Sequence, residues 1–133
     1  MSAKSLALAA ACVALAAVVP ATTAEAAESG IAPVRAGFVL TVDHAGDLPR
    51  LAVLQCSPNG GTHPSATLAC AQLSQVDGRF DKLNVNQGVA CVMIYDPVQV
   101  SAAGLWGRRV VHYAHTFGNA CELRAATGVV FGI

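Results

Sequence analysis

The stretch CSPNGGTHPSATLACAQL, residues 56–73, combines a forced loop, the start of a helix and two cysteines. Its proline, asparagine and paired glycines at 58–61 require a loop. Pro64 suits the first turn of a helix, because the N–H that proline lacks would have no partner there. Apolar side chains then recur at helical spacing, at Ala66, Ala69, Leu73 and Val76. We therefore predict a helix over residues 65–76, which Cys70 can join to the segment ending at Cys56.

Two runs of strand-forming residues precede this stretch. Residues 38–42 are rich in β-branched and aromatic side chains, and residues 43–47 form a cluster typical of a turn. Residues 50–56 follow at the distance expected of a hairpin partner. These patterns predict two adjacent antiparallel strands.

The second half of the chain has weaker signals. Residues 79–87 are polar and allow one helical turn, residues 98–101 indicate a strand, and Ala102-Ala103-Gly104 indicates a turn. The pattern then favours, in order, a long strand over 105–117, a short helix over 120–126 and a last strand over 128–133. No internal repeat or second domain is indicated.

The N-terminal residues have the features of a secretory signal peptide. An apolar run over 6–19 is broken by Pro20, and Ala24-Glu25-Ala26 fits the small-x-small rule for signal peptidase. We predict a signal peptide over 1–26 with cleavage after Ala26 or Ala27, a loose arm over 27–36 and one domain over 37–133. A membrane anchor is the competing interpretation, but the run is short for a span of about 20 residues. The mature protein is expected to be extracellular and free of the membrane.

The composition excludes several classes of protein. Eight acidic residues balance eight basic ones, so the chain lacks the basic excess that nucleic-acid binding needs. Apolar residues make up 54% of the chain and charged residues only 12%, which argues against disorder. The sequence therefore predicts a folded domain with a hydrophobic core and no nucleic-acid partner.

Cysteine usage indicates disulfides rather than a metal site. Cys12 leaves with the signal peptide, and the mature chain keeps four cysteines: Cys56, Cys70, Cys91 and Cys121. Four cysteines in a small secreted domain favour two disulfides, with three pairings open. The most economical pairing is Cys56–Cys70 with Cys91–Cys121. No CxxC spacing occurs, so a zinc site is not expected.

Motifs for catalysis are missing from the sequence. It contains no Gly-x-Ser-x-Gly elbow and no HExxH helix. His112 and His115 are three residues apart on an expected strand, so they point to opposite faces. His63 lies in the glycine- and proline-rich loop, where we expect a hydrogen-bonding structural role. We predict no enzymatic activity and no cofactor.

Several segments together resemble one known family. The pattern Cys56-x-Pro58-x-x-Gly61-x-His63-Pro64 with Ala69-Cys70-Ala71-x-Leu73 resembles the signature of the Streptomyces subtilisin inhibitor family. Further similarity lies at Leu40-Thr41-Val42, at Cys91-x-Met93-x-Tyr95-Asp96-Pro97-Val98, at Leu105-Trp106, and at Phe117, Asn119 and Cys121. The resemblance extends from about Ala36 to the C-terminus.

This resemblance implies an α+β fold, in which two helices pack on one face of a five-stranded antiparallel sheet. It implies disulfides between the first two and between the last two of the four cysteines, and a homodimer that associates through its sheets. It also implies inhibition of subtilisin-like, and often chymotrypsin-like, serine proteases. The family's primary specificity residue lies two places after the third cysteine, so the implied reactive bond is Met93–Ile94.

The residues around this bond suit a substrate-like loop. Cys91 would tie its upstream side to the scaffold, while Pro97 fixes φ downstream and restricts Asp96 before it. Between these anchors, Met93 is long and adaptable, which suits an apolar protease pocket. The remaining protease-contacting residues of the expected loop are Val92, Ile94 and Tyr95.

Three points qualify the comparison with the family. Val92 stands where some members carry proline, and the turn around Trp106 is altered. The local pattern is also compatible with an ordinary buried strand. The alternative function is a disulfide-stapled binding module for a non-protease partner.

Overall fold

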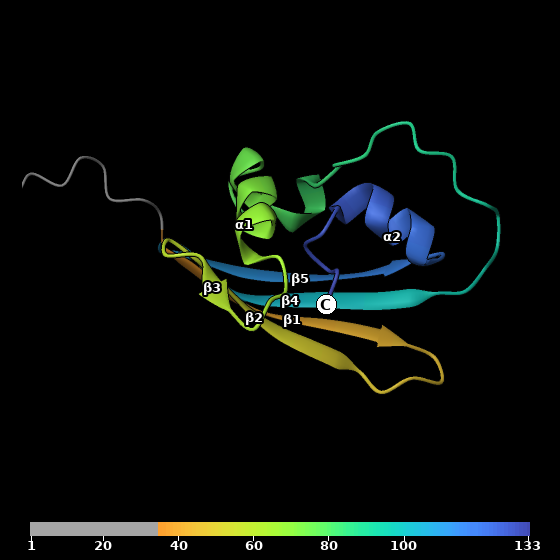
Figure 1. Ribbon diagram of the computed structural model, residues 1–133, viewed down its shortest axis with the longest axis horizontal. Coiled ribbons are helices and arrows are strands. Elements are labelled where there is room, and N and C mark those ends of the chain that lie inside the picture. The colour runs from red at the N-terminus through yellow and green to blue at the C-terminus, as the bar shows by residue number, and fades with distance from the viewer. Residues whose placement is uncertain (1–34) are drawn as a thin grey trace, which may run out of the picture. The chain divides into compact units, whose positions relative to one another are not determined.

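Residues 35–133 are described by the computed structural model, in which an antiparallel sheet of five strands carries two helices on one face (Figure 1). The spatial order of the strands is β3-β2-β1-β4-β5. In chain order the elements are β1 (Ala36–His44), β2 (Arg50–Cys56), β3 (Gly60–Gly61), α1 (Ala66–Gln75), the 3₁₀ turn η1 (Phe80–Lys82), β4 (Val98–Trp106), β5 (Arg109–Phe117) and α2 (Ala120–Thr127). The α+β fold is thus confirmed. The predicted signal peptide and its cleavage site lie outside the described residues.

The hairpin of β1 and β2 forms as predicted. Its pairing runs from Ala36 opposite Cys56 to Val42 opposite Arg50. Along β1 the side chains alternate, and Ala36, Phe38, Leu40 and Val42 are all buried. This alternation places one face of the sheet under the helices and leaves the other face open.

The prediction of a turn at residues 102–104 was wrong, because β4 continues through this segment to Trp106. Gly104 is required there by a close approach of two strands: a Cβ atom would lie 1.9 Å from the carbonyl oxygen of Gly37 on β1. The chain turns instead at Gly107 and Arg108, where Gly107 has φ +60°.

This corrected turn also changes which side chains share a face. In a single strand over 105–117, Trp106 and Phe117 would point to opposite faces of the sheet. In the structure, both are buried on the helix side of the sheet. The two-residue hairpin makes even-numbered positions of β4 and odd-numbered positions of β5 point inward. The predicted single long strand was therefore wrong.

The expected last strand over 128–133 was also wrong. After α2 the chain makes turns, and it buries Val130 and Phe131 in the core. The fifth strand is instead the short β3, which pairs Gly60 and Gly61 with β2. Apolar residues that fill a gap between helix and sheet have the same composition as strand residues, so periodicity did not separate the two.

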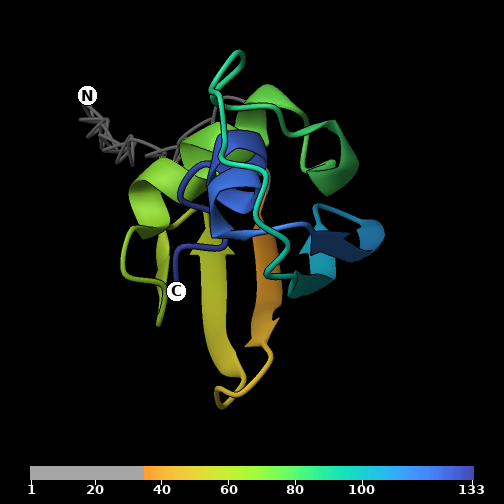
Figure 2. The same cartoon turned by 90° about the vertical axis from the view of Figure 1, so that its right-hand side faces the viewer.

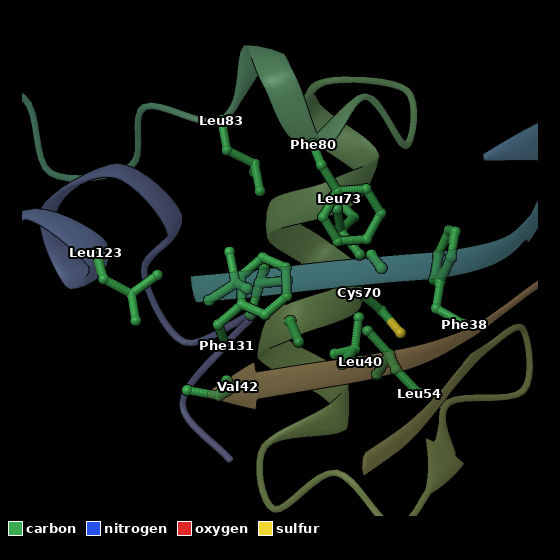
Figure 3. Packing of buried hydrophobic residues seen from close by; sticks show 14 of the residues in the cluster. Phe38, Leu40, Val42, Leu54, Cys70, Leu73, Phe80, Leu83, Leu123 and Phe131 are labelled. Atoms are coloured by element: carbon green, nitrogen blue, oxygen red, sulfur yellow. The ribbon is translucent and has the colours of Figure 1, made fainter. Parts of the chain in front are cut away.

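The core lies between the helices and the inner face of the sheet (Figure 3). Phe38 from β1 makes an edge-to-face contact with Phe80 of η1, with ring centroids 5.0 Å apart. The Cys56–Cys70 disulfide joins β2 to α1, as predicted. These two contacts therefore tie α1 and η1 to the sheet.

Two leucines of α1 allow a matched test of this packing. Leu73 is fully buried and Leu68 is 51% exposed. We expect Leu73→Ala to lower the free energy of unfolding by about 2–5 kcal/mol, because it removes buried methyl groups and leaves a cavity. Leu68→Ala should cost less than about 1 kcal/mol. Chemical denaturation of both variants checks this, and equal losses would contradict the assigned helix orientation.

Candidate functional site: an exposed loop held against α2

The connection from η1 to β4, residues 83–97, carries a row of exposed apolar side chains. Met93 is 94% exposed, and Val92, Ile94 and Tyr95 are 72%, 62% and 83% exposed. The segment has no strand pairing, so the alternative of an ordinary buried strand is wrong. Four consecutive exposed apolar residues are typical of an interaction surface.

The upstream limb of this loop is fastened to the C-terminal half of α2. The backbone N–H groups of Val85 and Asn86 donate to the carbonyl oxygens of Ala126 and Ala125, at 3.1 and 2.9 Å. The Asn86 side chain donates to the carbonyl oxygen of Arg124 at 3.1 Å. The bonds to Ala125 and Ala126 satisfy carbonyl groups that a helix C-terminus leaves without partners. In Figure 2 the loop passes along α2 before it reaches β4.

The first turn of α2 holds the loop covalently. Cys91 forms a disulfide with Cys121, as predicted. Met93 therefore lies two residues beyond a fixed point. The closed loop spans 30 residues of sequence, so the bridge also removes chain entropy from the unfolded state.

Asn119 connects the loop to the start of α2 through both ends of its amide. Its Nδ2 donates to the carbonyl oxygens of Val92 and Ile94, at 3.2 and 2.9 Å. Its Oδ1 accepts from the backbone N–H of Glu122 at 2.9 Å, which caps the helix. Asparagine immediately before a helical pattern signals a cap in the sequence, but nothing there indicated its contacts with the loop.

Met93 lies at the centre of a tight turn in the loop. The N–H of Ile94 donates to the carbonyl oxygen of Val92 at 2.9 Å, which closes a three-residue turn around it. The same Val92 carbonyl is held by Asn119. The backbone on both sides of Met93 is therefore fixed while its side chain projects into solvent.

The downstream limb is held at Asp96. Its N–H donates to the carbonyl oxygen of Gly118 at 2.8 Å, and its Oδ1 lies 2.8 Å from Nε2 of His44. The other ring nitrogen, Nδ1 of His44, lies 3.0 Å from Oδ2 of Asp47. The hydrogen bonds to Asp47 and Asp96 raise the pKa of His44 above its ordinary value. Sequence reasoning did not identify His44, because Asp96 is far from it in the chain.

His63 has the structural role that was expected of it. It is buried, its Nδ1 accepts from the N–H of Ser65 at 2.9 Å, and its Nε2 donates to the carbonyl oxygen of Val130 at 3.0 Å. Both ring nitrogens are thus used in holding the loop before α1 to the C-terminal segment.

The described part of the chain offers neither a metal site nor a helix that could span a membrane. Over residues 35–133, no cluster of three or more His, Cys, Asp or Glu side chains could hold a metal ion. Among the helices of the same residues, none is long and apolar enough to cross a membrane.

Residues 36–119 match the protein family described as subtilisin inhibitor-like. The chain belongs to this family. Subtilisin inhibitor-like protein 5 of Streptomyces fradiae is 49% identical over 83 residues, which are 62% of this chain and 78% of that protein. Trypsin inhibitor STI2 of Streptomyces longisporus is 44% identical over 107 residues, which are 76% of this chain and 73% of that protein.

A solved structure resembles this subtilisin inhibitor-like chain as a whole domain. It is Streptomyces caespitosus sermetstatin in complex with Bacillus licheniformis subtilisin. The alignment has a TM-score of 0.57 and 29% identity, and it covers 76% of this chain and 99% of sermetstatin. The relatives are named as inhibitors rather than enzymes, in agreement with the predicted absence of enzymatic activity.

The dual role of Asn119 allows its two functions to be separated. Asn119→Asp keeps an oxygen that can cap α2 but loses both donors to the loop. We expect amide hydrogen exchange in residues 92–96 to accelerate by roughly tenfold or more while the cap of α2 is kept, since each lost hydrogen bond to the loop is worth about 1 kcal/mol. Hydrogen-exchange mass spectrometry measures this change.

Asn119→Ala is the comparison variant, because it loses the cap as well. It should show the same faster exchange, together with a stability lower than that of Asn119→Asp by about 1 kcal/mol. Unchanged exchange in both variants would contradict the proposed hold on the loop.

Proposed function

We propose that this protein is a secreted inhibitor of subtilisin-like, and also chymotrypsin-like, serine proteases, and that the bond it presents to them is Met93–Ile94. The observation that carries the proposal is the 94% exposed Met93 side chain in a loop whose backbone is fixed on both sides of it. Membership of the subtilisin inhibitor-like family supports it. The solved complex of sermetstatin with subtilisin supports the class of partner.

A fixed loop suits inhibition because it lowers the cost of binding. Ordering a flexible side chain or segment at an interface costs about 0.5–1.5 kcal/mol for each side chain. Here the carbonyl groups of Val92 and Ile94 are already held before a protease arrives. The exposed Met93 can then fill an apolar specificity pocket as the dominant anchor, and Val92, Ile94 and Tyr95 can contact neighbouring subsites.

The same contacts explain how a cut loop can remain bound. Cleavage at Met93–Ile94 would leave the new carboxyl end tied by the Cys91–Cys121 disulfide. The new amine end would stay tied through the Ile94 carbonyl and the N–H of Asp96. Both ends therefore stay at high effective concentration, which favours resynthesis over release.

We also propose that the protein forms a homodimer through the open face of the sheet. This face carries exposed apolar side chains from four strands: Val39, Leu51, Val53, Leu105 and Val110. Such a surface on a sheet is typical of a face that another copy covers. The loop lies on the helix side of the sheet, so both loops of a dimer built in this way would stay accessible (Figure 1).

The reactive-bond proposal is tested by substituting Met93. The mature protein should abolish subtilisin activity at near-stoichiometric amounts. Met93→Gly should raise the inhibition constant by at least about thirtyfold, because a central anchor is worth 2 kcal/mol or more. Met93→Lys should shift preference toward trypsin. Inhibition assays against subtilisin, chymotrypsin and trypsin measure these changes.

A matched control is Val89→Gly, which alters an exposed apolar residue upstream of the disulfide. It should leave inhibition unchanged. Mass spectrometry after brief exposure to protease at low pH should show one cut, between Met93 and Ile94. Unaffected hydrolysis at an excess of wild-type protein would refute the function and leave a binding module for a non-protease partner as the alternative.

The dimer is tested by placing a charge on the open face. Val39→Glu, at the central strand, should convert a dimer to a monomer in sedimentation equilibrium, because the carboxylate would be desolvated at the interface. Leu68→Glu on α1 is the control and should remain dimeric. A wild-type protein that sediments as a monomer would contradict the proposed assembly.

A further inference from the structure

We propose that His44 is a positioning residue of the reactive loop, which holds the downstream limb of the loop through the side chain of Asp96. This inference rests on the proposed function and assigns a role to a residue outside the loop itself. His44 ends β1, and Asp96 lies 52 residues later in the chain. Figure 1 shows the β1–β2 turn and the entry into β4 at the same end of the sheet.

The two limbs of the loop are held by different means. Upstream of the reactive bond, Cys91 is joined covalently to α2. Downstream, the described contacts are hydrogen bonds: the Ile94 carbonyl with Asn119, the Asp96 N–H with Gly118, and the Asp96 carboxylate with His44. The limb that would carry the newly formed amine thus depends on non-covalent contacts. His44 supplies the one among them that uses the side chain of Asp96.

The geometry around His44 requires a charged ring. Each ring nitrogen faces a carboxylate oxygen, that of Asp47 at 3.0 Å and that of Asp96 at 2.8 Å. A carboxylate only accepts hydrogen bonds, and a neutral imidazole has only one N–H. Only the imidazolium can donate to both carboxylates at once, so loss of the proton leaves one contact with two acceptors facing each other.

The charged groups on the elements around His44 do not reverse its preference for the protonated ring. On the strand of His44 itself, Asp43 precedes it. The cation of β2 is Arg50, whose partner in the strand register is Val42. On β4 the strand partner is the uncharged Val98. Hydrogen bonds to Asp47 and Asp96 raise the pKa of His44. The stabilisation that the protonated His44 ring gives through its two contacts is therefore complete below the pKa of an unfolded histidine. It is lost as the pH rises through the higher folded-state pKa.

The contact itself is tested in the free protein by NMR titration of the His44 ring. Asp96→Asn should lower the pKa of His44, because a carboxylate that favours the imidazolium is removed. The matched control, Asp43→Asn, removes a neighbouring charge that makes no described contact with the ring, so it should have little effect. Equal pKa values in the wild type and Asp96→Asn would overturn the proposal.

The positioning role is tested by the inhibition constants of wild type and His44→Gln for subtilisin, measured from about pH 5.5 to about pH 9. Taking their ratio at each pH cancels the protease's own titration. We expect His44→Gln to be weaker by about two- to fivefold at the acidic end, the range for a solvent-exposed ion pair, and equal at the alkaline end. In the Asp96→Asn background, His44→Gln should have no further effect at any pH.

The outcomes separate the two proposals. Normal inhibition with a ratio near one at every pH would overturn the role of His44 and leave the reactive loop intact. A ratio that is large but independent of pH would show a merely structural histidine and would also overturn the role. Absence of inhibition by the wild type would overturn the proposed function, and the positioning role with it.

Discussion

The amide of Asn119 is the contact on which the functional geometry depends. One side of this group caps α2, and the other holds two carbonyl groups that flank Met93. A helix cap is a rigid reference point, because its backbone is committed to the first turn. The loop therefore takes its shape from the helix, although its own sequence has no repetitive structure. The disulfide at Cys121, two residues later, fastens the same turn to the same loop.

The sheet separates two tasks between its faces. The inner face packs under α1, η1 and α2 and builds the core. The outer face carries exposed valine and leucine side chains, which a soluble protein tolerates best when they are covered. The proposed loop and the proposed dimer face therefore lie on opposite sides of one layer, so that one surface can associate without blocking the other.

Much of the fold was predictable from short-range signals. The β1–β2 hairpin, helix α1 and helix α2 each have local patterns of alternation, helical spacing or capping. The errors came where long-range contacts decide. Gly104 suggests a turn in sequence, but it serves a close approach to Gly37 on another strand. Residues 128–133 have strand composition, but the core needed Val130 and Phe131 to fill space.

The sequence by itself determined the resemblance to the family and, through it, the expected pairing of the four cysteines and the segment that contains Met93, because that resemblance depends on residue types at set spacings. Only the tertiary structure decided that Met93 is exposed while its neighbouring carbonyls are held. It also decided that His44 meets Asp96. Those contacts join residues many positions apart, and hydrogen bonds of this kind leave no periodic trace in the chain, since each partner is an ordinary polar residue until folding brings the two together.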